Sequence, residues 1–179
     1  MWHGYRATAR NHVVCIFLLI MLLGAVPEQV QADRPPSTAG ETSRLAELDA
    51  YWAKVSRAVK EGNFDLYAST CHKDGVLVTG VKQQCYPLSK ALARWKQDFV
   101  DTKAGKTKAS VVFRFRQRLG DETTAHESGI FLYTATDANG KNIKNYIHFE
   151  ALLLKRDGWK IMMEYQKSKA TVEEWNGLH

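Results

Sequence analysis

Apolar and polar positions alternate with a period of two through most of the C-terminal half of the chain. Side chains that alternate in this way point to opposite faces of an extended strand. The pattern predicts four strands, at residues 109–118, 124–136, 143–155 and 159–168. Asn139-Gly140 and Asp157-Gly158 are strong hairpin-turn signals, because Gly accepts the positive φ of a tight turn. We therefore predict an antiparallel meander.

In the N-terminal half, apolar positions recur every three or four residues, which is the spacing of an amphipathic helix. A first helix is expected from Thr42 to Gly62, which ends it. Asn63 is expected to cap a short second helix, and a third is expected at about 89–103. A short strand, 75–79, lies between the second and third helices.

Three helices and a short strand, followed by a four-stranded meander, predict an α+β domain. We expect a cone-shaped, curved antiparallel sheet that wraps around the three N-terminal helices. A sheet of this size leaves a hollow between itself and a short helical layer. The pattern therefore also predicts a pocket.

The first 32 residues have the features of a secretory signal peptide. Arg6 and Arg10 precede an apolar run at 13–26, and small residues occupy the positions before Asp33 that a signal peptidase reads. The alternative is an uncleaved anchor, but fourteen apolar residues are short against the roughly 20 that a membrane-spanning helix needs. We predict cleavage after Ala32, export to the periplasm or the exterior, and no stable membrane insertion of the mature protein.

Cleavage would leave a flexible linker at 33–42, a domain at 43–170 and a C-terminal tail at 171–179. The linker is rich in Pro and Ser and has nothing to bury. The tail contains Trp175, and it either packs on the domain or frays.

Composition argues against several classes of function. The formal net charge is +6, but both signs are mixed along the chain, so nucleic-acid binding is not implied. No His or Cys pair beyond Cys71-His72 has metal-ligand spacing, and the sequence has no Gly-rich phosphate loop. We therefore predict no metal site and no cofactor.

Cys71 and Cys85 would remain after export to an oxidising compartment. A disulfide between them would stabilise the fold by about 3 kcal/mol in the chain-entropy model. Two free thiols are the alternative, and the sequence leaves both open.

Three segments together carry a resemblance to a known family. They are LDAYWAKVSRAVKEGNFDLYASTCHKDGVLV, SKALARWKQDF and KRDGWKIMMEYQKS. Their order and spacing resemble the nuclear transport factor 2-like (NTF2-like) superfamily, in its SnoaL-like branch close to the calcium/calmodulin-dependent kinase association domain, over residues 45–168. The resemblance implies a conical α+β barrel with a deep pocket, usually dimeric through its sheet. Members include isomerases, dehydratases, cyclases, epoxide hydrolases and pure binding modules, so the fold leaves the function open.

If both hairpin turns have two residues, the more apolar face of the sheet lines the pocket. That face would carry Phe113, Phe115, Ile130, Leu132, Ile147, Phe149, Ala151, Leu153 and Met162, with Gln117, His126, Ser128, Glu164 and Gln166 as polar members. The opposite face would carry Arg114, Arg116, Glu127, Tyr133, Tyr146, His148, Glu150, Ile161, Met163 and Tyr165. Its aromatic and aliphatic surface suggests a partner sheet, so we predict a homodimer. A one-residue bulge would exchange the two faces.

Glu164 is the candidate general base or acid, with His126 as its partner. Ser128 and Gln166 are candidate hydrogen-bond donors. The candidate pocket walls from the helices are Tyr51, Tyr67 and Trp95. The alternative for the catalytic pair is a surface role, with His126 facing water and Glu164 paired with a surface lysine.

The chain departs from the catalytic members that the resemblance suggests. It lacks the Asp and Tyr pair of the steroid isomerases and the Asp-Arg-Asp set of the epoxide hydrolases. Ala151 and Gln166 stand where the resemblance to the kinase association domain implies pocket arginines, which argues against anion binding. We favour an exported, noncatalytic or weakly catalytic protein that binds a small apolar or amphipathic molecule. The alternative is a cofactor-independent lyase or isomerase that acts by general acid-base catalysis in the same pocket.

Overall fold

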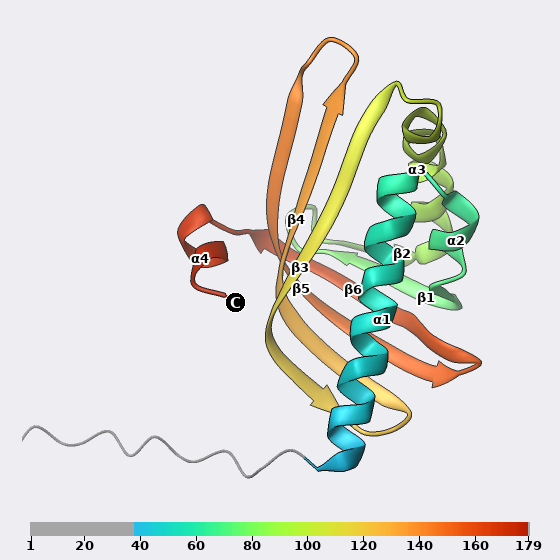
Figure 1. Ribbon diagram of the computed structural model, residues 1–179, viewed down its shortest axis with the longest axis vertical. Helices are drawn as coiled ribbons and strands as arrows, with labels where there is room; N and C mark the ends of the chain where they lie inside the picture. The colour runs from blue at the N-terminus through green and yellow to red at the C-terminus, as the bar shows by residue number, and fades with distance from the viewer. Residues whose placement is uncertain (1–37, 179) are drawn as a thin grey trace, which may run out of the picture. The chain divides into compact units, whose positions relative to one another are not determined.

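The structure is a computed structural model that describes residues 38–178 (Figure 1). The predicted signal peptide, its cleavage site after Ala32 and residues 33–37 of the predicted linker lie outside the described residues. The helices are α1 (Ala39–Glu61), α2 (Phe64–Ala68), α3 (Leu88–Lys103) and α4 (Val172–Asn176). The strands are β1 (Cys71–Thr79), β2 (Gln84–Pro87), β3 (Thr107–Gly120), β4 (Thr124–Asp137), β5 (Asn142–Arg156) and β6 (Gly158–Lys169).

The start of α1 differs from the prediction. The helix begins at Ala39 instead of Thr42, because the Thr38 side chain accepts a hydrogen bond from the Glu41 backbone N–H (3.2 Å) and caps the helix. Residues 39–42, predicted as linker, are therefore helical.

The other helix boundaries follow the sequence signals. Gly62 ends α1 with φ 64°, a left-handed conformation that glycine adopts without steric cost. The Asn63 side chain accepts a hydrogen bond from the Leu66 backbone N–H and caps α2, as predicted. α3 begins at Leu88, one residue before its predicted start.

The predicted α+β class and the four-stranded antiparallel meander are confirmed. The sheet has the order β2-β1-β6-β5-β4-β3, and β3 to β6 pair antiparallel with their neighbours along the chain. Its strands curve, as Figure 1 shows. Because β2 and β3 are the two edges and do not pair with each other, the sheet stays open and does not close into the barrel that the family resemblance implied.

The first two strands differ from the prediction. β1 pairs with β6 in parallel, so the sheet is mixed and not wholly antiparallel. A parallel neighbour needs a long connection, and the chain between β1 and β6 includes α3 and four strands. β2, where the sequence pattern predicted no strand, forms a short antiparallel edge strand on β1.

Helices α1, α2 and α3 cover one face of the sheet, which we call the inner face (Figure 1). The core lies between this face and α1, with Trp52 near its centre. The Trp52 ring lies 4.4 Å from Phe113 and 5.7 Å from both Phe115 and Phe149, measured between ring centroids. Aromatic contacts of this kind add stability beyond the area that they bury.

The side chains of β4 lie on the opposite faces of the sheet from those predicted. The Asp137 backbone N–H donates a hydrogen bond to the Lys141 carbonyl oxygen (3.1 Å), so the loop between this pair has three residues, 138–140, and not the predicted two. The Asp137 side chain stabilises the loop by accepting hydrogen bonds from the Asn139 and Lys141 backbone N–H groups, and Gly140 takes φ 79°. The inner face of β4 therefore carries Ala125, Glu127, Gly129, Phe131 and Tyr133. The residues predicted to face inward, His126, Ser128, Ile130 and Leu132, lie on the outer face.

Bulges alter the facing of two further strands. In β3 the pairing shifts between Phe115 and Gln117, so Gln117 faces outward, against the prediction. The turn between β5 and β6 does not have the predicted two residues, because Lys155 pairs with Trp159 and Arg156 with Gly158, so Ile161, predicted to face outward, is buried in the core. Met162, predicted to face inward, is the extra residue of a bulge that restores the predicted register, so Glu164 faces inward as predicted.

The C-terminal tail packs on the outer face of the sheet as helix α4 (Figure 1). Trp175 is buried against Tyr146 (5.7 Å between ring centroids), and the Arg114 guanidinium stacks over the indole at 4.4 Å. Arg114 also donates hydrogen bonds to the Trp175 and Leu178 carbonyl oxygens, at 2.8 and 2.9 Å. Of the two fates that the sequence left open for the tail, the structure therefore shows packing.

Candidate functional site

A cavity of about 340 Å³ lies between α1, α2 and α3 and the inner face of the sheet. Its lining residues are Tyr51, Trp52, Val55, Val59, Tyr67, Thr70, Cys71, Trp95, Asp98, Phe99, Thr102, Ala109, Val111, Phe113, Phe131, Tyr133, Asn145, Ile147, Phe149, Ile161, Glu164 and Gln166. The volume falls in the range of small-molecule sites, and the cavity lies at the predicted position.

Aromatic rings form a large part of the cavity wall. Phe149 is 2% exposed, and its ring lies 5.6 Å from Phe113 and 5.9 Å from Phe131. On the helical side, Tyr67 contacts Trp95 (6.2 Å) and Phe99 (5.0 Å), again between centroids. The wall is therefore built by rings from both layers of the fold.

Glu164 contributes a carboxyl group to the sheet side of this wall. Its Oε1 accepts a hydrogen bond from the Gln166 side-chain amide at 2.6 Å. Burial raises the pKa of the Glu164 carboxyl, because the charged form loses hydration, and the Gln166 hydrogen bond only partly opposes this effect. A carboxyl with a raised pKa inside a cavity is a recognised mark of a functional site.

Three further groups lie near Glu164. Burial is the main cause of a raised pKa for the Tyr51 and Tyr67 phenols, and the negative charge of Glu164 adds to it. The Tyr51 hydroxyl donates a hydrogen bond to the Thr70 carbonyl oxygen (3.1 Å). The pKa of the Cys71 thiol is raised to about 12, mainly by burial and then by Glu164. All three side chains are therefore neutral hydrogen-bonding groups at ordinary pH.

A second set of polar side chains lines the cavity where α3 lies over the sheet. Asp98 and Thr102 lie one helical turn apart, and Tyr133 and Asn145 face them from the sheet. The pKa of Tyr133 is raised by burial first and by the Asp98 charge second. The cavity thus has carboxyl groups at two places in a largely apolar wall.

Five of the predicted site residues line this cavity: Tyr51, Tyr67, Trp95, Glu164 and Gln166. His126 and Ser128 do not, because the three-residue loop turns β4 over. His126 Nε2 instead lies 3.4 Å from a carboxylate oxygen of Glu150 on the outer face. The prediction that His126 is the acid-base partner of Glu164 is therefore wrong.

Sequence reasoning missed Asp98 and Tyr133. Asp98 follows Trp95 by three residues, so the helical period places it beside a residue already assigned to the pocket, and this signal could have found it. Tyr133 had no such signal, because its facing depends on the length of the loop that precedes β5.

The structure also separates Cys71 from Cys85, and both are free thiols. Their positions can be compared along β6. Cys71 on β1 pairs with Ile161 of β6, whereas Cys85 on β2 pairs with Val78 of β1, which in turn pairs with Tyr165 of β6. Four residues along a strand correspond to about 13 Å, well beyond the distance that a disulfide can bridge. The fold therefore excludes the disulfide that the sequence allowed.

Thiol accessibility tests this arrangement. We expect Cys85, which is exposed, to react rapidly with a disulfide reagent in the native protein, and Cys71 to react only on unfolding, because its raised pKa keeps it protonated. The time course of thiol release measures both, and the variants Cys85→Ser and Cys71→Ser assign the two phases. A native protein in which these two thiols are linked would contradict the fold described here.

The pH dependence of stability tests the burial of Glu164. The folded state, with the raised pKa, binds more protons than the unfolded state, so the free energy of unfolding should fall as pH rises from the ordinary value of 4.5 through the raised pKa. We expect Glu164→Gln to lack this decrease and to be more stable than the wild type at neutral pH, because the amide carries no charge that burial would penalise. Denaturant unfolding across this pH range measures the difference. Parallel curves for the two proteins would contradict the burial of the carboxyl.

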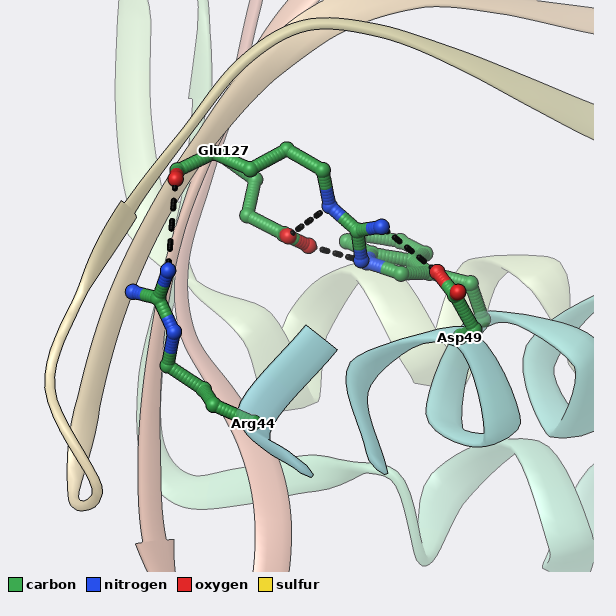
Figure 2. Close-up of polar contacts among 5 residues, drawn as sticks. Arg44, Asp49 and Glu127 are labelled. Carbon is green, nitrogen blue, oxygen red and sulfur yellow. Dashed lines mark hydrogen bonds and ion pairs between the residues drawn. The ribbon is translucent and has the colours of Figure 1, made fainter. Parts of the chain in front are cut away.

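A buried ion-pair network positions Trp52 in the cavity wall. Glu127 is 0% exposed, and one of its carboxylate oxygens accepts a hydrogen bond from the Trp52 indole N–H. Its other oxygen accepts from Arg118 Nε (2.5 Å), and Arg118 also donates to Asp49 on α1 (2.5 Å). Figure 2 shows Glu127 and Asp49 joined through this network, with Arg44 beside it. The network therefore ties β3 and β4 to α1.

The described residues contain no group of three or more His, Cys, Asp or Glu side chains that could hold a metal ion. No helix in the described part of the chain is both long and apolar enough to cross a membrane.

Comparisons with known proteins agree on a family and a fold. The family model described as the calcium/calmodulin dependent protein kinase II association domain matches residues 44–171. No curated protein matches the chain.

Three solved structures illustrate the fold similarity. A conserved protein from Planctomyces limnophilus DSM 3776 has a TM-score of 0.60 at 12% identity, covering 69% of this chain and 94% of that chain. An NTF-2 like protein of unknown function from Shewanella oneidensis MR-1 has a TM-score of 0.52 at 15% identity, covering 68% and 96%. A ketosteroid isomerase-like protein from Erwinia carotovora atroseptica SCRI1043 has a TM-score of 0.50 at 17% identity, covering 73% and 95%. At these identities the similarity concerns the fold alone.

Proposed function

The chain belongs to the calcium/calmodulin dependent protein kinase II association domain family, of NTF2-like fold, and we propose that it binds a small apolar or amphipathic molecule in the cavity beneath its helices. The observation that carries the proposal is a cavity of about 340 Å³ whose wall is mostly aromatic and aliphatic. Such a wall gains free energy when a ligand displaces water from it. The few polar groups then orient the ligand.

Glu164 and Gln166 support a binding role over a catalytic one. Acid-base catalysis needs a carboxyl that is coupled to a proton acceptor or donor. Among the described residues, Glu164 accepts a side-chain hydrogen bond from the Gln166 amide, and His126 lies on the other face of the sheet. A cofactor-independent lyase or isomerase is the second candidate, because the raised pKa of Glu164 suits a general acid near neutral pH.

Competition for the cavity tests the binding proposal. The neutral fluorescent probe N-phenyl-1-naphthylamine is expected to bind the wild-type protein, and Ala109→Trp, which fills the cavity from β3, to weaken binding about tenfold or more. Val100→Trp on α3 is the control, since Val100 is 47% exposed and does not line the cavity. No binding to the wild type, or equal binding by both variants, would overturn the proposal. Native mass spectrometry of protein purified from its own host would then identify any retained ligand.

We also propose that the protein is exported, on the basis of the signal-peptide pattern in residues 1–32. The mature protein should then begin at Asp33. N-terminal sequencing of extracellular or periplasmic material tests this proposal, and an intact Met1 in that material would contradict it.

A homodimer through the outer face of the sheet remains our proposal for the protein's partner. The supporting surface differs from the predicted one: Tyr133 and Ile161 face inward, and Tyr146 lies under Trp175. Val112 and Leu119, each 49% exposed, still leave apolar surface on β3. Sedimentation should report twice the chain mass, and Val112→Glu should reduce the fraction of dimer. A wild-type monomer would contradict the proposal.

A further inference from the structure

The cavity is acidic although the chain as a whole is basic. Its lining includes the carboxyl groups of Asp98 and Glu164, and none of the described lining residues is Lys, Arg or His. The full chain, by contrast, has 25 Lys and Arg residues against 19 Asp and Glu. Basic side chains do line a separate surface pocket that includes Lys73, Arg156 and Lys160. The lack of basic side chains is therefore a local property of the cavity beneath the helices.

Aromatic rings surround the same space. Nine of the lining residues are aromatic. The face of an aromatic ring carries partial negative charge and attracts a cation, and the attraction grows when the cation is desolvated, as in the aromatic cages that bind quaternary ammonium groups. An anion in the same place would meet negative ring faces and carboxylates with no positive partner. The wall therefore discriminates by charge as well as by size.

The position of Glu164 adds to the preference of the cavity for a cation over an anion. Only Oε1 of its carboxyl accepts a hydrogen bond from a described side chain, which leaves Oε2 able to contact a ligand. The negative charge of Glu164 adds to the effect of burial in raising the pKa of the Tyr67 phenol, and the Tyr67 ring packs against Trp95 and Phe99. A carboxylate and a cluster of rings thus adjoin one another in the cavity.

We propose that the ligand is a monocationic amphipathic molecule, an amine or quaternary ammonium compound with an apolar body, whose charged head lies against Glu164 and the neighbouring rings. The inference rests on the proposed binding function and specifies its ligand class. A ligand cation would offset the burial of the Glu164 carboxylate, which is costly while unpaired. The apolar body would extend along the rings of Phe113, Phe131 and Phe149.

Binding of the cation should depend on pH through Glu164. The groups that face it are Tyr51 from α1, Tyr67 from α2, Cys71 from β1 and Gln166 from its own strand, and Asp98 lines the cavity from α3. None of these groups is a cation, so protonation of Glu164 removes negative charge without a compensating change. Cation affinity should therefore fall as pH is lowered through the pKa of Glu164.

Displacement of N-phenyl-1-naphthylamine by three matched compounds tests the inference. They are benzyltrimethylammonium, its uncharged isostere neopentylbenzene, and the anion phenylacetate. We expect the cation to bind about tenfold more tightly than the isostere, from cation–π and ionic attraction, and the anion not to compete. Glu164→Gln should weaken the cation about tenfold and leave the isostere unchanged. In the wild type, a change from about pH 8 to about pH 4 should weaken only the cation, and the part of this pH effect that Glu164→Gln removes belongs to Glu164 and not to Asp98.

Each outcome decides one of the two proposals. If the isostere competes at least as well as the cation, or if neither pH nor Glu164→Gln alters the ratio of the two affinities, the cation inference is overturned while the binding function stands. Strong competition by phenylacetate would overturn it in the same way. If the fluorescent probe does not bind in the cavity at all, the binding function fails and the cation inference fails with it.

Discussion

Replacement of Glu127 by alanine is expected to lower the free energy of unfolding by about 3–5 kcal/mol. Glu127 is 0% exposed and pairs with Arg118, whose side chain is mostly buried. Without the carboxylate, Arg118 keeps only its pair with Asp49, and the Trp52 indole N–H loses its acceptor. A buried charge or donor that loses its partner costs far more than the net gain from the original pair. Chemical denaturation measures the change.

Glu150→Ala is the matched control for this substitution. Glu150 lies on the neighbouring strand and accepts a hydrogen bond from Lys167 at 2.6 Å, but the pair is solvent-accessible. Its loss should cost about 0–1 kcal/mol, because water replaces the partner. Equal losses for the two variants would show that the Glu127 network is not buried as described.

Loss of the network should also change the position of Trp52 in the cavity wall. Trp52 lines the cavity and is held by Glu127, so Glu127→Ala should broaden and shift the tryptophan emission under conditions in which the protein remains folded. Glu127→Gln retains an acceptor for the indole and should restore the emission while recovering only part of the stability. This variant separates the placement of Trp52 from the charge of Glu127.

Phe149→Ala is expected to cost about 3–5 kcal/mol, the range measured for large aromatic residues truncated in protein cores. The Phe149 ring is 2% exposed and contacts Trp52, Phe113, Phe115 and Phe131. Truncation removes these contacts and leaves a void that the sheet cannot close, because the neighbouring positions are set by backbone pairing. Thermal and denaturant unfolding measure the loss.

Val100→Ala provides the comparison at an exposed position of α3. Val100 is 47% exposed, and its truncation should change stability by less than about 0.5 kcal/mol. Phe149→Leu should fall between the two, because it retains part of the buried volume. If Phe149→Ala were as mild as Val100→Ala, the aromatic core would not lie where the structure places it.

The order and type of the elements could be predicted from the sequence because their causes are local. Asn63 caps α2 through a hydrogen bond to Leu66, three residues away, and the period of two along β3 to β6 reflects a sheet with one covered face. The family resemblance rested on the same ordered segments, and the family match over residues 44–171 confirms it.

Site residues were predicted correctly where the pattern within one helix or strand shows which of its side chains point inward. Tyr51, Tyr67 and Trp95 lie on helices whose inward side is marked by neighbouring apolar residues, and all three line the cavity. Glu164 was also placed correctly, although no local signal marked the bulge at Met162 that precedes it. His126 was misplaced because one additional loop residue reverses every side chain of β4.

The sequence by itself determined helices α1 to α3, strands β3 to β6, their order along the chain and the apolar side of each helix, since these depend on neighbours a few residues apart. Only the tertiary structure decided which side chains share the cavity, that Glu127 is buried beneath Trp52, and that Cys71 and Cys85 lie far apart. Those outcomes depend on strand register and loop length. A difference of one residue costs little locally but exchanges the two faces of a strand, so the packing of the whole sheet against its helices selects between them.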